Sequence, residues 1–290
     1  MLEKFVEDAT GKKIRKSASL KGGISSEMMK FELSSGESVV LRHITNSDWL
    51  NEEPDLIEHE KQSLLIIKSM PVPTPHFLAA GTPQIEALLM SELPGRVDLE
   101  MTQSPDAINQ LATTLHAIHQ TPIMESFKWT YSSYVDLTNV SIPSWTTQHQ
   151  AWSMAINFVQ TTMPKFHPVF IHRDYHPTNI LWAGNQLSGV ADWINACKGP
   201  ALVDVAHCRM NLVMLYGLEI ADQFVDAYLQ LSNETYTPYW DILGFLDFVD
   251  EELDVYGGWT DSGYSILNRT ILQQRADEYI HNLTSKLDAP

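Results

Sequence analysis

One eight-residue segment, His172-Arg173-Asp174-Tyr175-His176-Pro177-Thr178-Asn179, constrains this chain more than any other feature. It places an aspartate five residues before an asparagine. A short apolar run, Ile180 to Trp182, follows directly, and Gly184-Asn185 then fits the two-residue turn of a β-hairpin. The sequence therefore predicts a polar loop that leads into a tight hairpin.

The returning strand of this hairpin runs from Leu187 to Ala191 and ends at Asp192. If positions 183 and 186 pair beside the turn, position 192 falls opposite position 177, so Asp192 lies beside Asn179. Carboxylate and amide oxygens suit a hard cation such as Mg²⁺. We therefore expect Asn179 and Asp192 to be metal ligands, with Asp174 just upstream on the loop.

This arrangement suits phosphoryl transfer, which needs positioning and charge neutralisation more than covalent chemistry. A metal ion bridges the phosphate oxygens, while a separate carboxylate orients the acceptor hydroxyl and takes its proton. Asp174 is the predicted catalytic base. The alternative is a chance turn beside a structural hairpin, and the agreement between the spacing and the hairpin speaks against it.

The segment resembles the catalytic loop of the protein-kinase-like superfamily, and its details are similar to the aminoglycoside-phosphotransferase (phosphotransferase enzyme) family. The motifs that carry this likeness are His176-Pro177, Asp192-Trp193, Gly199-Pro200 and Asp204-Val205-Ala206. The resemblance implies an α+β, bilobal protein-kinase-like fold, with a small antiparallel-sheet N-lobe and a larger, mainly helical C-lobe. It also implies Mg²⁺ and a nucleoside triphosphate, ATP or GTP, as co-substrate.

The resemblance extends into the N-terminal part and implies the nucleotide-binding residues there. Those of the loop that covers the phosphates are Gly22, Gly23, Ser25 and Ser26. Arg42 stands where the family's relatives carry a lysine that binds phosphate, and Glu60, or its neighbour Glu58, resembles the helix glutamate that pairs with it. The stretch 88–95, with Ser91 and Leu93, resembles the hinge whose backbone meets the adenine.

Two residues depart from the family pattern. Arg42 replaces lysine, but a guanidinium can still bind phosphate. Arg173 replaces the glycine that is usual in the catalytic loop, and protein kinases carry arginine at this place. His172, His176 and Asp204 are interpreted as structural residues, with Asp204 anchoring the catalytic loop.

The wider pattern divides the chain at Leu93-Pro94-Gly95 into an N-lobe of residues 1–93 and a C-lobe of residues 94–290. The N-lobe shows a hairpin over 24–43, a helix over 54–69 and two strands over 76–91. The helices expected in the C-lobe, some of them broken, cover 108–119, 203–218, 221–231, 240–256 and 265–287.

Composition excludes several classes of function. The net charge is −17, so binding of nucleic acid through its phosphates is not expected. No apolar run is long enough to cross a membrane. The N-terminus does not read as a signal peptide, and Cys197 and Cys208 form no disulfide framework or zinc pattern. We expect a cytoplasmic protein; the sequence does not give its oligomeric state.

The expected partner is a small-molecule hydroxyl acceptor. No lysine or arginine occurs between Asn233 and Asn268, and this stretch could attract a cationic acceptor or merely be a solvated acidic face. Its acids include Asp241, Asp247, Asp250, Glu251, Glu252, Asp254 and Asp261. The sequence leaves an aminoglycoside, choline, a sugar, an amino alcohol and a macrolide open, together with a catalytically silent nucleotide-binding protein.

Overall fold

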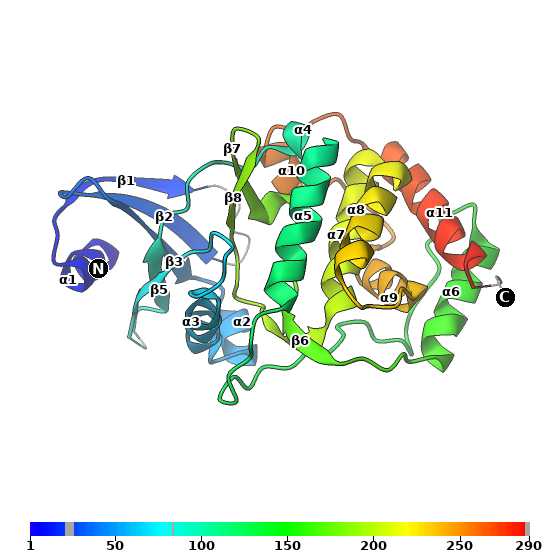
Figure 1. The fold of residues 1–290 in the computed structure, drawn as a ribbon, viewed down its shortest axis with the longest axis horizontal. Helices are drawn as coiled ribbons and strands as arrows, with labels where there is room; N and C mark the ends of the chain where they lie inside the picture. Colours follow the sequence, from blue (N-terminus) through cyan, green and yellow to red (C-terminus); the bar gives the residue numbers. More distant parts are fainter. Residues whose placement is uncertain (21–25, 83, 288–290) are drawn as a thin grey trace.

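The computed structural model describes residues 1–20, 26–82 and 84–287. Figure 1 shows a small sheet-containing part beside a larger helical part, with the two chain termini at opposite ends. The α+β architecture predicted from the sequence is confirmed. Among the described residues, no helix is long and apolar enough to span a bilayer.

The N-terminal part is a five-stranded antiparallel sheet in the order β1-β2-β3-β5-β4. Its strands are β1 (Ile14–Leu20), β2 (Ser26–Leu33), β3 (Ser38–Ile44), β4 (Phe77–Ala80) and β5 (Ala87–Ser91). Its helices are α1 (Leu2–Thr10), α2 (Ser47–Glu52) and α3 (Leu56–Ile67). The predicted hairpin, strand pair and helix are confirmed as β2–β3, β4–β5 and α3.

The two faces of this sheet have different neighbours because side chains alternate along a strand. On β3, Leu41 joins Val6 of α1 in one core cluster. Val40 lies in a second cluster with Leu64 of α3. Arg42 shares the parity of Val40, so it too faces α3.

The C-terminal part is mainly helical. Its helices are α4 (Leu99–Thr102), α5 (Pro105–His119), α6 (His149–Thr161), α7 (Ala201–Tyr216), α8 (Leu218–Leu231), α9 (Pro238–Phe248), α10 (Gly257–Asp261) and α11 (Arg269–Ser285). Figure 1 shows α5, α7 and α8 packed side by side. One core cluster runs through these helices and reaches Val40 and Leu88 of the sheet. The boundary at residue 93 stays a prediction.

The helix predicted over 240–256 is wrong in its second half, because α9 ends at Phe248. The carboxylate of Asp250 accepts the backbone N–H groups of Glu252 and Leu253, at 3.0 and 2.6 Å. Such an aspartate turn competes with the helical hydrogen bonds. Leu253 then adopts a positive φ of 45°, which takes the chain out of the helical direction.

Two small two-stranded sheets support the loop that the sequence singled out. They are formed by β6 (Pro168–Ile171) with β9 (Cys197–Pro200), and by β7 (Ile180–Ala183) with β8 (Gln186–Val190). The loop 172–179 connects the first sheet to the second, and the N-terminus of α7 follows β9 directly. These elements position the candidate active site.

Candidate active site

Asp204, in the first turn of α7, anchors the loop that carries Asp174. Its fully buried carboxylate accepts the backbone N–H groups of His172, at 2.7 Å, and Arg173, at 2.6 Å. Nε2 of His119 lies 3.1 Å from the same carboxylate. These bonds hold a tight bend in which Arg173 has a φ of 68°. Asp204 thus has the anchoring role that the sequence predicted.

His172 braces the loop from within the core. One of its ring nitrogens, Nε2, lies 2.9 Å from the carbonyl oxygen of Ala191, and the other, Nδ1, accepts the backbone N–H of Asp174 at 3.2 Å. One nitrogen therefore donates and the other accepts, which requires a neutral imidazole. Burial favours the same state by lowering the pKa of His172. The residue is a brace, as expected.

The carboxylate of Asp174 has partners on both of its oxygens. Oδ2 accepts a hydrogen bond of 2.9 Å from the amide nitrogen of Asn179. Oδ1 lies 3.2 Å from Nε2 of His207 on α7 and 3.5 Å from Nε2 of His176. Burial alone would raise the pKa of Asp174, but the two imidazoles outweigh it and hold that pKa well below its usual range.

The β7–β8 hairpin differs from its prediction by one residue. Ala183 pairs with Gln186 as expected, but a bulge between Leu181 and Trp182 shifts the register, and Ile180 then pairs with Val190. Position 192 consequently falls opposite position 178 instead of 177. The shift moves Asp192 one residue closer to Asn179, whose carbonyl oxygen accepts the N–H of Ala191 at 2.9 Å.

Arg42, on β3, joins the sheet to this hairpin. Its Nη2 donates to Oδ1 of Asp192 at 2.9 Å, its Nε lies 3.0 Å from Oε2 of Glu60, and its Nη1 donates to the hydroxyl of Ser26 at 3.2 Å. Arg42 and Glu60 are buried, whereas the side chain of Asp192 is 34% exposed. Glu58, the alternative partner, instead bonds Lys61 on the outer face of α3.

Burial and mutual attraction both shift the pKa values of Arg42 and Glu60. Burial opposes the charge of Arg42, but Asp192 and Glu60 outweigh it and raise the Arg42 pKa, so this side chain stays charged. Burial raises the pKa of Glu60 to about 7, against the attraction of Arg42. Since Asp192 is the exposed member of the group, it is the one that can turn toward a ligand.

The oxygen atoms offered by Asn179 and Asp192 fit a hard cation. The Nδ2 group of Asn179 is held by two bonds to Asp174, one to its backbone oxygen and one to its side chain, each 2.9 Å. This fixes the amide and leaves its Oδ1 available as a ligand. Asp192 has a positive φ of 65°, a strained state for a residue other than glycine. Strain of this kind is often found at functional sites.

The remaining predicted nucleotide-binding residues are Gly22, Gly23, Ser25, Ser91 and Leu93. Gly22, Gly23 and Ser25 lie outside the described residues. Ser91 uses its hydroxyl to accept the N–H of His76, at 2.8 Å, and its own N–H donates to the carbonyl oxygen of the same residue. Leu93 follows in the segment that links β5 to α4. The adenine contacts of Ser91 and Leu93 stay predictions.

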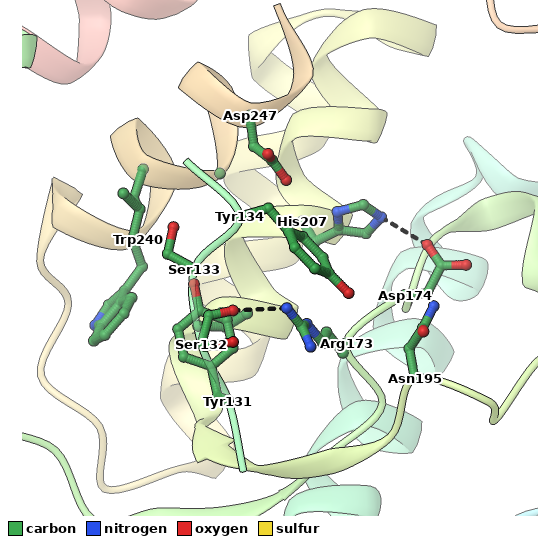
Figure 2. Close-up of a pocket in the computed structure, with 13 residues that line it drawn as sticks. Tyr131, Ser132, Ser133, Tyr134, Arg173, Asp174, Asn195, His207, Trp240 and Asp247 are labelled. Atoms are coloured by element: carbon green, nitrogen blue, oxygen red, sulfur yellow. Dashed lines mark hydrogen bonds and ion pairs between the residues drawn. The ribbon is translucent and has the colours of Figure 1, made fainter. Parts of the chain in front are cut away.

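A cavity of about 170 Å³ opens beside Asp174 (Figure 2). Its walls come from five segments of the C-terminal part. The lining residues are Tyr131, Ser132, Ser133, Tyr134, Arg173, Asp174, Asn195, Val203, His207, Trp240, Leu243, Gly244 and Asp247. Figure 2 shows Asp247 and Trp240, both on α9, across the cavity from Asp174.

Arg173, which replaces the glycine usual at this place, lies in the wall of this cavity. Its guanidinium sits 4.1 Å from the ring centre of Tyr134 and 5.4 Å from that of Tyr131. It also donates to the carbonyl oxygen of Ser132 at 2.6 Å. This side chain fills space that a glycine would leave open, and it adds a fixed positive charge to a cavity that also holds carboxylates.

Of the acidic residues between Asn233 and Asn268, only Asp247 lines this cavity. Asp241 is buried elsewhere, 3.3 Å from Arg209 and 2.6 Å from the hydroxyl of Tyr279. Asp254 pairs with Arg269 at the surface. Burial raises the pKa of Asp247, although His207 and Arg173 oppose the shift. The acidic run is therefore mostly structural or solvated.

His207 was not predicted from the sequence as a site residue. The residue lies three positions after Asp204, which puts it one helical turn along the same face of α7. That spacing was the available signal, because a helix whose first turn anchors the loop 172–179 presents its next turn to the same loop. Burial opposes the charge of His207, but its bond to Asp174 outweighs burial and raises the pKa of the imidazole.

Residues 18–245 match the phosphotransferase enzyme family. A comparison with curated proteins found no match. Among solved structures, aminoglycoside phosphotransferase APH(4)-Ia is 17% identical, with 97% of each chain covered and a TM-score of 0.65. Macrolide 2′-phosphotransferase MphH from Brachybacterium faecium is 14% identical, with 99% of this chain and 97% of that chain covered and a TM-score of 0.61.

Amicoumacin kinase hAmiN, solved with AMP-PNP, Ca²⁺ and Ami, is 12% identical, with 97% of each chain covered and a TM-score of 0.60. At these identities the structural likeness establishes a shared fold, which agrees with the sheet and the helical part described above. The family match covers well over half of the sequence, including the loop 172–179 and the β7–β8 hairpin. The chain belongs to the phosphotransferase enzyme family.

Proposed function

We propose that this phosphotransferase moves the γ-phosphate of ATP to a hydroxyl group of a small, cationic acceptor. The observation that carries the proposal is the position of Asn179. Its side chain fixes Asp174 in the cavity wall, and its backbone pairs with the strand that ends at Asp192. One residue thus couples an acceptor site to a site for a metal-bound phosphate.

Asp174 is the proposed base. Its two oxygens are oriented by Asn179 and His207, and Oδ1 is on the side of the cavity (Figure 2). An acceptor hydroxyl bound there would donate its hydrogen bond to this carboxylate and give up its proton as the new oxygen–phosphorus bond forms. The low pKa of Asp174 keeps it ionised and ready to accept that hydrogen bond.

The nucleotide side is proposed to use the N-lobe, residues 1–93, and the mouth of the hairpin. Arg42 would bind phosphate oxygens while Glu60 keeps its guanidinium in place. Asn179 and Asp192 would hold Mg²⁺, which neutralises phosphate charge when bound. Solved relatives of this fold contain ADP or AMP-PNP, which supports ATP as the co-substrate.

The acceptor is proposed to bind in the cavity of the C-lobe, residues 94–290. Asp247 can pair with an ammonium group, and the exposed ring of Tyr134 offers an aromatic face. The relatives solved with hygromycin B and with Ami support a small-molecule acceptor. Arg173 repels a second ammonium group near it, which favours an acceptor with few amines over a densely charged one.

A catalytically silent nucleotide-binding protein is the second candidate. The observation that favours it is the direct contact of Arg42 with Asp192, which a bound metal ion would have to share. The two candidates differ in one measurable property, since only the enzyme releases ADP in step with phosphorylation of an acceptor.

The test is phosphate transfer from γ-labelled ATP, with Mg²⁺, to a panel of aminoglycosides, choline-like amino alcohols, sugars and macrolides. Asp174→Asn keeps the size of the base and removes its charge. We expect at least one amine-bearing acceptor to be labelled by the wild-type protein and none by the variant. Binding of MgATP without any labelling across the panel would favour the silent protein instead.

A further inference from the structure

Three side chains that can bind a metal ion lie close together, those of Asp174, His176 and His207. Oδ1 of Asp174 lies 3.2 Å from Nε2 of His207 and 3.5 Å from Nε2 of His176, and each residue can offer a ligand atom within 4.8 Å of the others. The residues come from the catalytic loop and from α7. They include neither Asn179 nor Asp192, the ligands proposed for Mg²⁺.

The spacing fits a small transition-metal dication. Bonds of about 2.0–2.1 Å in tetrahedral geometry place neighbouring ligand atoms about 3.3 Å apart. The two short distances at Asp174 are close to that value. Two imidazoles and one carboxylate form a ligand set that suits Zn²⁺ and similar ions, whereas Mg²⁺ prefers oxygen ligands.

The surroundings orient these ligands. Nδ1 of His176 lies 3.1 Å from the hydroxyl of Thr178, so the ring can donate to Thr178 while Nε2 faces Asp174. Partners of this kind fix the orientation of metal-binding histidines. Figure 2 shows Asp247 on the far side of the His207 ring from Asp174. His176 is buried, while about 30% of the His207 side chain is exposed, which leaves access from the cavity.

We propose that Asp174, His176 and His207 form a binding site for a divalent transition-metal ion of the Zn²⁺ class. The three protein ligands leave a fourth position open toward the cavity for water. Because Oδ2 of Asp174 stays with Asn179, only Oδ1 is needed for the metal ion. The consequence for catalysis rests on the proposed function: an occupied Oδ1 cannot take the acceptor proton, so the ion inhibits transfer.

The metal site is tested first by ion binding alone, with no assay of phosphate transfer. The full chain is titrated with Zn²⁺ against a colorimetric indicator, and with Co²⁺ while its visible absorption is followed. We expect one ion per chain and the strong visible bands of tetrahedral Co²⁺. His207→Ala should weaken binding by about 100-fold or more, since even outer partners of such ligands are worth about 10- to 100-fold.

Two further variants show whether a loss of metal binding is specific to the cluster and separate from a loss of fold. His167→Ala removes an exposed histidine outside the cluster and should leave the affinity unchanged. His207→Gln keeps a polar side chain of similar reach, so a cooperative melting transition well above the assay temperature shows that a loss of binding is not a loss of fold. Equal Zn²⁺ affinity in the wild-type, His207→Ala and His207→Gln proteins overturns the proposed site.

Inhibition is measured separately, at saturating MgATP. Zn²⁺ should lower the transfer rate in competition with the acceptor, and a chelator should restore it. Stoichiometric Zn²⁺ binding at this cluster without inhibition would refute Asp174 as the base while leaving the metal site in place. Absence of the one-to-one site would refute the metal proposal and leave the phosphotransfer proposal untouched.

Discussion

Nη2 of Arg42 lies 2.9 Å from Oδ1 of Asp192, across 150 residues of sequence. The same guanidinium meets Glu60 through Nε at 3.0 Å. Arg42 therefore uses two different N–H groups of its planar fork, one toward the helix that packs on the sheet and one toward the hairpin of the C-terminal part. An ammonium group is a compact point charge without this rigid fork, so it holds two partners less well in this geometry.

We predict that Arg42→Lys weakens MgATP binding. The variant keeps one charge but loses at least one charge-assisted hydrogen bond, worth about 1.5–3 kcal/mol. This corresponds to a roughly 10- to 100-fold higher Kd, measured by calorimetry. Arg96→Lys, at an exposed arginine that pairs with Asp98, is the control and should bind MgATP normally. An unchanged Kd in Arg42→Lys would remove Arg42 from the nucleotide site.

The parts of the fold with strong local patterns could be predicted from sequence. The β2–β3 hairpin, α3 and the Ala183–Gln186 turn follow from alternation, helical spacing and a glycine-asparagine pair. In contrast, β1 is polar and almost entirely exposed, so no alternation marks it. The bulge at Leu181 leaves no compositional signal, and the predicted register was wrong by one residue.

The site was predictable only where its residues lie close together in sequence. Asp174, Asn179 and Asp192 belong to one loop and its hairpin. The cavity wall instead combines residues 131–134 with Asp247, and tertiary packing brings them together, with the ring of Tyr131 against that of Trp240 on α9. Asp247 resembled its acidic neighbours in sequence, since nothing local separates a cavity-lining aspartate from one that ends a helix.

Asp204→Asn should destabilise the protein and slow transfer. The carboxylate accepts on both oxygens, from two backbone N–H groups and from His119. An amide has one oxygen, so in either orientation its NH₂ group faces a donor. We expect a loss of about 1.5–3 kcal/mol in the free energy of unfolding, measured with urea.

The control for this variant is Asp226→Asn, at an exposed position of α8, which should leave the unfolding curve unchanged. Since the loop bonds of His172 and Arg173 are loosened in Asp204→Asn, kcat should fall more than the acceptor KM rises. Wild-type stability in Asp204→Asn would contradict the anchoring role.

The pair of His207 and Asp174 predicts a pH dependence of stability. The folded-state pKa of His207 is raised above its ordinary 6.5 because Asp174 stabilises the imidazolium. Its stabilising contribution is therefore complete below pH 6.5 and is lost as the pH rises through the raised pKa. We expect the stability difference between the wild type and His207→Gln to shrink as the pH rises from 6 toward 9.

Urea unfolding at several pH values measures this difference. His167→Gln, at an exposed position, should give a difference that does not change over the same pH range. A wild-type advantage over His207→Gln that grows with pH would show that His207 is neutral beside Asp174.

Asp247→Asn should raise the KM for an amine-bearing acceptor and leave the KM for MgATP unchanged. Asp247 is the acidic residue of α9 that lines the cavity, and the loss of a hydrogen bond to a charged group costs about 1.5–3 kcal/mol, or roughly 10- to 100-fold in affinity.

Because burial raises the pKa of Asp247, the wild-type acceptor KM should also rise as the pH falls toward that pKa, whereas the variant should lack this dependence. Steady-state kinetics between pH 5 and 8 give both readings, with Asp261→Asn, at an exposed position outside the cavity, as the matched control. An acceptor KM that is equal in the wild-type and Asp247→Asn proteins across this range would place the amine elsewhere in the cavity.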